Sequence, residues 1–345
     1  MDSSFEDFCL SLPKIELHAH LNGSLSDKIL PLLGCPYSDI CNYQKLRNIP
    51  IGQRNLENVF KTFAIAHKAT SSSQTVYLAT LNLIKEFAAD NVIYLELRTT
   101  PRNEEGMSAE NYIESVIKAI QDSTNRILVK LILSLNRQHS LEECTNNLNL
   151  ILKKQSEYPD IIKGIDLSGN PIHGSFHDLK HLFERGRNNN LFTTIHCGEV
   201  VNSKEIHEIL EFRPERIGHA CYLHPNYNGC IQNWNLLKEL RLPTEICLTS
   251  NIVTGTVDIY ENHHVQEWIK DNLPFSLNTD DKGIFNTSLS QEFQIAKKFF
   301  KFSAPDLWKI SMNSIEDSFA NAEEKIYLKM KLEDWKFKNY KFFSQ

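Results

Sequence analysis

The sequence lacks the long apolar runs of membrane spans and secretory signals. No stretch approaches the ~18 uncharged apolar residues that a transmembrane helix needs, and the first residues are acidic rather than basic. The eight cysteines form no C-x-x-C pair, and without a secretory route we expect reduced thiols rather than disulfides. These absences predict a cytosolic protein that does not bind membranes.

The sequence also has no excess of basic residues. Lys and Arg number 37 against 43 Asp and Glu, which gives a net charge of −6 over 345 residues. Such a surface does not attract the phosphate backbone of nucleic acid, so any basic site must be a local pocket. With 41% hydrophobic residues, the chain has ample apolar material for a core. We expect a monomer that binds a small molecule and no nucleic acid.

The sequence does contain short apolar runs, rich in β-branched residues, that alternate with longer amphipathic stretches. Near-continuous apolar strands alternating with helices are typical of a parallel sheet covered on both faces. We expect eight strands, at 14–20, 92–98, 127–135, 162–168, 191–197, 216–220, 243–248 and 274–280. Helices are expected between them, as at 71–90, 108–122, 140–157 and 203–212, several opened by a serine that can cap the first turn.

Eight strand–helix units favour a closed (β/α)8 TIM barrel over an open doubly wound sheet, and no G-x-G-x-x-G motif follows the first strand. The long stretch at 21–91 is expected to hold extra helices over the barrel mouth, where loops carry function. Residues after 285 predict terminal helices. We expect residues 1–345 to form this one barrel domain.

Polar side chains gather where these strands end. His18 and His20 close the first strand and, being two residues apart, point to the same side. A barrel brings the carboxyl ends of its strands to one face, where the chemistry of barrel enzymes takes place. Two histidines, a third from the fifth strand and a carboxylate from the eighth suit Zn²⁺ or another divalent transition ion. The residues that end the other strands are His196, His219, Asp280 and Asp281.

Less specific interpretations exist for these residues. A single histidine at a strand end is more often a hydrogen-bonded core residue than a ligand. Glu199 follows His196 closely and can be an acid of the first helical turn or the general acid that such a site needs. Other histidines, His139 among them, are expected to be solvated. Neither an H-E-x-x-H helix nor an H-x-E motif with P-C-x-x-C is present, which excludes two other kinds of zinc site.

Several segments resemble the adenosine/AMP deaminase superfamily in order and spacing across nearly the whole chain. They are PKIELHAHLNGS (13–24), IDLSGNP (165–171), HCGE (196–199), RIGHA (216–220), CLTSN (247–251) and NTDD (278–281). Within the superfamily, the chain is similar to the adenosine deaminase-like branch, the N6-methyl-AMP deaminases. Asn22 in HAHLNGS, Thr99, Thr100 and Arg102 in LELRTTPR, and Lys282 in NTDDKG favour that branch.

The resemblance implies a role for each residue of the site. One zinc ion would lower the pKa of a bound water, which would then attack C6 of a purine. Glu199 would protonate ring N1, while His219 and Asp280 would orient the water. Asp281 would hydrogen-bond ring N7, and the backbone N–H of Gly169 would face N3. The zinc ligands would be His18, His20, His196 and Asp280.

The resemblance also assigns one end of the pocket to a 5′-phosphate. Arg102 would bind it, since Arg offers a two-donor fork; without the resemblance, Arg102 would be a solvated side chain after a Thr-Thr turn. Asn136 stands where the family pattern has an aspartate, and residues 34–55 match no pattern of the branch. The other substrate contacts would be His20, Asn22, His67, Thr99, Thr100, Pro101, Asn136, Gly169 and Asp281.

The implied activity is zinc-dependent hydrolytic deamination of N6-substituted purine nucleotides, which would convert N6-methyl-AMP to IMP and methylamine. An adenosine deaminase acting on the free nucleoside is the alternative enzyme. A barrel that has lost catalysis and only binds is the alternative of another class. The retained ligand set and Glu199 favour catalysis over binding alone.

Overall fold

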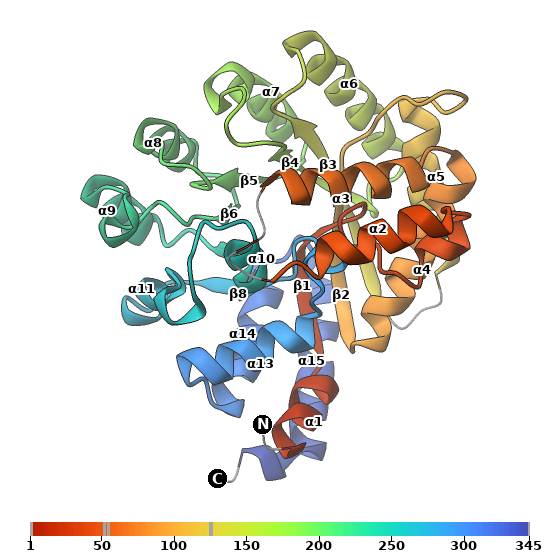
Figure 1. Cartoon of the computed structure of the whole chain (residues 1–345). Coiled ribbons are helices and arrows are strands. Elements are labelled where there is room, and N and C mark those ends of the chain that lie inside the picture. The colour runs from red at the N-terminus through yellow and green to blue at the C-terminus, as the bar shows by residue number, and fades with distance from the viewer. Residues whose placement is uncertain (1–2, 51–52, 54–55, 124–126, 344–345) are drawn as a thin grey trace.

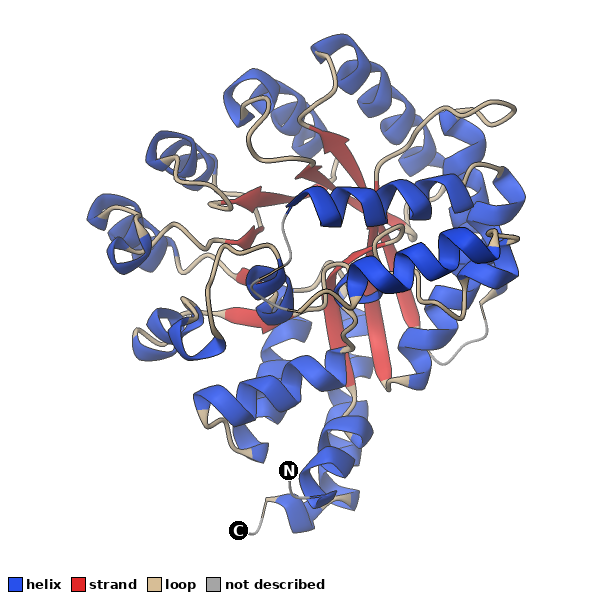
Figure 2. Ribbon diagram, viewed as in Figure 1, coloured by secondary structure: helices blue, strands red, loops and turns tan. Residues whose placement is uncertain are grey.

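Eight parallel strands form one sheet that curves into a barrel (Figure 1, Figure 2). The computed structural model describes residues 3–50, 53, 56–123 and 127–343. Neighbouring strands pair in chain order, which confirms the predicted (β/α)8 TIM barrel. The strands are β1 (Lys14–His20), β2 (Val92–Thr99), β3 (Leu128–Asn136), β4 (Ile162–Ser168), β5 (Phe192–Cys197), β6 (Arg216–His219), β7 (Thr244–Ile246) and β8 (Phe275–Leu277).

The barrel closes between β1 and the residues that follow β8. Ala19 pairs with Asp280 in an isolated parallel bridge. His20 donates its N–H to the Asp280 carbonyl at 2.9 Å, and the Asp280 N–H donates to the His18 carbonyl at 2.8 Å. The backbone that closes the barrel therefore belongs to the segments that carry three of the predicted metal ligands.

Two strands are shorter than predicted. β7 and β8 cover three residues each, rather than the expected 243–248 and 274–280. The helix α10 (Leu248–Val253) follows β7 at once, and Asp280 takes a left-handed φ of 59° that ends the extended chain after β8. Asn278 replaces part of the missing ladder, because its side-chain oxygen accepts the Leu17 N–H at 3.0 Å. The other strand limits differ from the prediction by no more than one residue.

Helices surround the barrel, and short polar residues cap them. Ser108 and Ser140 accept hydrogen bonds from backbone N–H groups at the starts of two predicted helices. Ser72 caps the helix predicted from 71, and Asn202 caps the one predicted from 203. These outer helices are α4 (Ser73–Ala89), α5 (Ala109–Asp122), α6 (Leu141–Glu157), α7 (Phe176–Asn188), α8 (Ser203–Phe212), η2 (Pro225–Tyr227), α9 (Ile231–Leu240), η3 (Tyr260–Asn262) and α11 (Val265–Lys270).

The long connection between β1 and β2 carries helices over the barrel mouth, as predicted. It contains η1 (Leu30–Leu33), α2 (Tyr37–Arg47) and α3 (Leu56–Ala69) before α4. Figure 1 shows α2 and α3 crossing in front of the strand ends. An ion pair between Arg47 and Asp27 and a hydrogen bond from the Tyr43 hydroxyl to the Leu25 carbonyl (2.7 Å) hold α2 in place.

The first helix packs against the C-terminal helices. After β8 comes the short α12 (Lys282–Phe285), which was not predicted. The predicted terminal helices follow as α13 (Leu289–Phe300), α14 (Ala304–Asp317), α15 (Ala322–Lys338) and η4 (Tyr340–Phe342). α1 (Ser3–Ser11) leads into β1, and the Phe8 ring centroid lies 5.5 Å from that of Trp335 and 5.3 Å from that of Phe342. Figure 1 shows α1 and α15 on the same side of the molecule. None of the described helices combines the length and hydropathy that a membrane crossing requires.

Candidate active site

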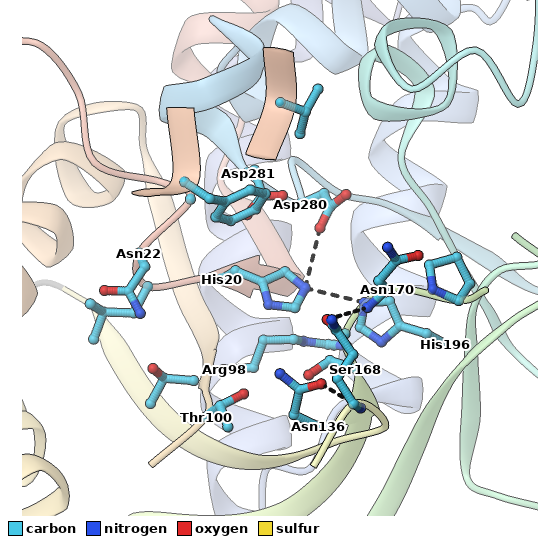
Figure 3. A pocket seen from close by; sticks show the side chains of 18 of the residues that line it. His20, Asn22, Arg98, Thr100, Asn136, Ser168, Asn170, His196, Asp280 and Asp281 are labelled. Atoms are coloured by element: carbon cyan, nitrogen blue, oxygen red, sulfur yellow. Dashed lines mark hydrogen bonds and ion pairs between the residues drawn. The ribbon is translucent and has the colours of Figure 1, made fainter. Parts of the chain in front are cut away.

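Four predicted ligands converge at the carboxyl ends of the strands. Figure 3 shows His20, His196 and Asp280 facing one another. The ligand atoms of His18, His20, His196 and Asp280 all lie within 4.8 Å of one another. His20 Nε2 lies 3.2 Å from His196 Nε2 and 3.3 Å from Asp280 Oδ1. The Nε2 of His18 is buried and makes no hydrogen bond within the described structure. Three imidazole nitrogens and a carboxylate oxygen facing one another are a donor set that fits a zinc-type metal ion.

Two of these imidazoles are oriented from behind by buried carboxylates. Glu245 Oε2 lies 2.6 Å from His18 Nδ1, and Asp166 Oδ1 lies 2.9 Å from His196 Nδ1. Because Nδ1 is engaged in each ring, Nε2 is the atom presented to the metal position. Burial disfavours charge on His196, but the charge and hydrogen bond of Asp166 outweigh it and raise the pKa of His196 to about 9.

The two carboxylates belong to a buried charge network that the sequence predictions did not include. Arg98 donates to Asp166 at 3.3 Å and to Glu245 at 2.9 Å. Arg216 donates to Glu245 at 2.7 Å and also binds Glu96. All of these side chains are fully buried. Charged residues within otherwise apolar strands were the available signal, because a buried charge is costly unless it is paired.

Glu199 and His219 lie across from the Asp280 carboxylate. His219 Nε2 is 3.9 Å from Glu199 Oε1 and 3.9 Å from Asp280 Oδ2. Asn251 Nδ2 lies 3.1 Å from His219 Nδ1, and the Ser250 hydroxyl donates to Asp280 Oδ2 at 2.7 Å. Burial raises the pKa of Glu199, and the Asp280 charge adds to the effect. A carboxyl group that keeps its proton to higher pH is suited to general acid catalysis.

The backbone is strained where two of these side chains attach. His219 has a φ of 62° and Asp280 a φ of 59°, both in the left-handed region that non-glycine residues rarely adopt. Such conformations cost on the order of 1–3 kcal/mol each and persist where the surrounding structure enforces them. At both positions the bend occurs at or just after the end of a strand, next to the metal position.

Asp281 is packed against Gly23 beside the ligands. A Cβ on Gly23 would lie 1.6 Å from Asp281 Oδ1, so only glycine fits there. Asp281 Oδ1 is buried without a hydrogen-bond partner in the described ranges. Burial, together with the charges of Asp280 and Glu199, raises the pKa of Asp281 well above its usual value. When it carries a proton, this carboxyl group can donate a hydrogen bond into the cavity.

His20, His196 and Asp280 line a cavity of about 530 Å³. This size is typical of small-molecule sites. Val59, Phe63 and His67 of α3 line it from the mouth side. His18 is fully buried behind His20, and Pro101 is buried outside the lining. The predicted residues that line the cavity are His20, Asn22, His67, Thr99, Thr100, Arg102, Asn136, Gly169, His196, Glu199, His219, Asp280 and Asp281.

The residues predicted to bind a 5′-phosphate are joined by a hydrogen-bond network. Asn22 Nδ2 donates to the Tyr112 hydroxyl at 3.3 Å, and that hydroxyl lies 2.6 Å from Thr99 Oγ1. The Thr70 hydroxyl donates to Asn22 Oδ1 at 2.9 Å and accepts from Arg102 at 2.8 Å. Sequence reasoning missed Tyr112 and Thr70, because one lies on α5 and the other just past α3, away from any strand end.

Arg102 itself is held on three sides. Its Nε donates to Glu104 at 2.9 Å, and its Nη2 donates to the Thr70 carbonyl at 2.7 Å. The guanidinium carbon also lies 4.9 Å from the centroid of the Tyr112 ring. Two of the three nitrogens are thus already bonded within the protein. Burial and the nearby Arg102 charge lower the pKa of His67 to about 4, so this imidazole is neutral at neutral pH.

Asn136 and Gly169 meet on another wall of the cavity. A Cβ on Gly169 would lie 2.2 Å from Asn136 Oδ1, and a φ of 100° also requires glycine there. Asn136 Oδ1 accepts the Gln138 N–H at 2.9 Å. His139, predicted to be solvated, is half-buried: it lines the cavity and its Nδ1 is buried.

The order of these residues along the chain is that of a known family. A model of the adenosine deaminase family matches residues 13–335. The chain belongs to the adenosine deaminase family. Membership identifies it as a metal-dependent hydrolytic deaminase, which agrees with the ligand group and with the neighbouring Glu199.

Within the adenosine deaminase family, several relatives are named N6-methyl-AMP deaminases, and others are named adenosine deaminase-like proteins. The N6-mAMP deaminase of Arabidopsis thaliana is 36% identical over 349 residues, covering 92% of this chain and 96% of its own. The N6-Methyl-AMP deaminase of Homo sapiens is 35% identical, covering 94% of each chain. The crystal structure of arabidopsis ADAL complexed with IMP superposes with a TM-score of 0.85 at 35% identity, covering 95% of this chain and 98% of its own.

Proposed function

We propose that this member of the adenosine deaminase family hydrolyses N6-substituted purine 5′-monophosphates, converting N6-methyl-AMP and water to IMP and methylamine. The observation that carries the proposal is one cavity holding the metal group, Glu199 and the Arg102 network. A 5′-phosphate needs hydrogen-bond donors of this kind, whereas a free nucleoside has no phosphate to bind. Relatives named for this activity, and a relative's complex with IMP, support the proposal.

We propose a single zinc ion as the metal. The buried Nε2 of His18 makes no hydrogen bond to a described residue and lies 3.3 Å from the Asp280 carboxylate, an arrangement that supports a cation at this position, and imidazole with carboxylate is a donor set that zinc prefers. When bound, the ion lowers the pKa of water and so supplies a nucleophile at neutral pH. The residues that would hold it are His18, His20, His196 and Asp280.

The chain's own groups act on the purine ring. Glu199, whose pKa is raised by burial, holds the proton that is delivered to ring N1, and this transfer makes C6 more electrophilic. His219, between Glu199 and Asp280, orients the attacking water. Protonated Asp281 donates to ring N7, and the Gly169 N–H faces N3. Together these contacts hold the ring with C6 toward the metal position.

The remaining predicted contacts serve the ribose and the phosphate. Arg102 has Nη1 left for the phosphate, because Nε and Nη2 are bonded within the protein. Thr100, His67 and Asn22 line the cavity and offer uncharged donors. Asn136 contacts the substrate on the Gly169 side. A phosphate held largely by uncharged donors is consistent with the small net charge of this end of the cavity.

The test compares N6-methyl-AMP, AMP and adenosine as substrates of the metal-loaded protein, with products separated by chromatography. Turnover of N6-methyl-AMP with little of the other two would support the proposal. Strong turnover of adenosine would instead establish the nucleoside deaminase. If the metal-loaded protein turned over none of the three, a binding role or another amine substrate would be favoured.

Two variants refine this comparison. Arg102→Ala is expected to lose nucleotide turnover selectively over nucleoside turnover, whereas Arg185→Ala, at an exposed arginine of α7, is expected to change neither. Equal losses on both substrates in Arg102→Ala would refute the phosphate assignment. Full turnover by Glu199→Gln would refute the proton-transfer role of Glu199.

A further inference from the structure

The cations that line the cavity are already paired with carboxylates. Among the described lining residues these cations are Arg98 and Arg102. Arg98 is bound by Asp166 and Glu245 in the barrel interior. Arg102 is bound by Glu104, with Nε 2.9 Å from Oε1. The 5′ end of the cavity therefore presents an arginine whose charge is balanced, and no further lining Lys or Arg within the described ranges.

Glu104 is fixed in place and not a loose surface carboxylate. Its N–H donates to the Met107 carbonyl at 2.8 Å, and its carbonyl accepts the Met107 N–H at 3.0 Å. This pair closes a tight turn in which Gly106 takes a φ of 79°, and the Met107 side chain is buried. The carboxylate lies next to Arg102, is not among the residues that line the cavity, and has a side-chain exposure of 34%.

Further phosphate groups placed next to the Arg102–Glu104 pair would be repelled by Glu104 and would find no additional cation among the described residues of the lining. A monophosphate can take the free side of the Arg102 guanidinium and the uncharged donors around it. A second or third phosphate group would add negative charge next to the Arg102–Glu104 pair, where the Glu104 carboxylate repels it and the described lining offers no additional Lys or Arg. Repulsion of an unwanted ligand is a common means of setting specificity.

We propose that Glu104 is a specificity-determining residue that restricts the substrate to nucleoside monophosphates and disfavours di- and triphosphates. The inference rests on the proposed function, since it requires the 5′-phosphate to lie at Arg102. Glu104 acts through its charge on the incoming phosphate groups. Glu105, the next residue, is exposed and provides a matched control of equal charge.

The experiment measures competitive inhibition by inosine, IMP, IDP and ITP on the full-length, metal-loaded protein. In the parent protein we expect IMP to bind more tightly than inosine, and ITP more weakly than IMP. In Glu104→Gln we expect the ratio of ITP to IMP affinity to rise by about 5-fold, a modest factor because the carboxylate is partly exposed to solvent. In Glu105→Gln the ratio is expected to stay at its parent value.

Further outcomes separate charge from geometry and from the proposed function. Glu104→Asp keeps the charge and is expected to keep the parent ratio; a rise equal to that of Glu104→Gln would overturn the charge argument. An unchanged ratio in Glu104→Gln would overturn the inference alone, provided that IMP still outcompetes inosine. Equal binding of inosine and IMP by the parent protein would overturn the phosphate assignment and the inference with it.

Discussion

A buried carboxylate at Nδ1 of a ligand histidine determines how that imidazole faces the metal position. Asp166 illustrates this, because it binds His196 Nδ1 at 2.9 Å and also accepts from Ser134 at 2.9 Å and from Arg98. Without that anion, the His196 ring loses the partner that fixes its orientation and raises its basicity. The metal affinity of the site thus depends on residues that do not touch the ion.

Asp166→Asn is expected to weaken metal binding about 10- to 100-fold, because the uncharged amide is a poorer acceptor for the His196 N–H. Competition with a fluorescent zinc chelator measures the affinity. Asp160→Asn, at a carboxylate whose side chain is 92% exposed, is the matched control and should bind metal as the parent does. Equal affinities for the two variants would contradict the role assigned to Asp166.

At the residue scale, the sequence predicted the groups at strand ends but not their partners. His18 and His196 could be placed because barrel geometry brings strand ends together. Glu245 could not be paired with His18, since 227 positions separate them in the chain and only the barrel's closure brings them into contact. Glu104 was missed for a different reason: a short polar turn after a strand is typical of any solvated loop.

Among the elements, the seam between β1 and β8 depends on a side chain. Asn278 is fully buried; its oxygen accepts the Leu17 N–H at 3.0 Å and its amide donates to the Ser276 hydroxyl at 2.9 Å. Because β8 is short, Leu17 has no described strand partner on the side of β1 that faces β8. One amide group therefore stabilises the point where the barrel closes.

Asn278→Ala is expected to lower the free energy of unfolding by about 2 kcal/mol, because it leaves the buried Leu17 N–H unpaired. Urea denaturation measures the change. Asn146→Ala, at an exposed position on α6, should have little effect. If both variants unfold at the same urea concentration, the seam does not depend on Asn278.

At the element scale, apolar runs were sufficient to locate all eight strands. The end of β8 could not be predicted, because Asp280 leaves the extended conformation through a left-handed bend that no sequence pattern marks. The end of β7 was missed because α10 begins at Leu248, within an apolar run. α2 was expected only as part of an insertion: its segment, YSDICNYQKLR, is mostly polar and has no clear apolar period. Its position follows from contacts such as Arg47 with Asp27, which are visible only in the fold.

For the molecule as a whole, a metal ion bound to the four ligands would also stabilise the folded state. The ligand side chains converge from β1, β5 and the end of β8, so an ion there would link distant parts of the barrel. Binding to the folded state alone adds roughly 4 kcal/mol when the metal concentration is 1,000 times the Kd. We propose that residues 1–345 form one domain, acting as a cytosolic monomer, whose unfolding this linkage controls.

Removal of the metal with a chelator is expected to lower the Tm by several degrees, and added zinc should restore it. Differential scanning fluorimetry makes the measurement. His20→Ala, at a ligand that is 19% exposed and therefore tolerates truncation, should have a lower Tm that hardly responds to the chelator. A chelator shift of the same size in His20→Ala would place the stabilising ion elsewhere.

The aromatic contact between α1 and the C-terminal helices has a practical consequence. Because α1 enters the barrel at the amino end of β1 and the ligands lie at its carboxyl end, about 20 Å of strand separates the joined ends from the site. A tether at either end would leave the mouth open to solution. The neighbouring ends would also suit circular permutation, in which a short linker joins them and new ends open in an outer loop.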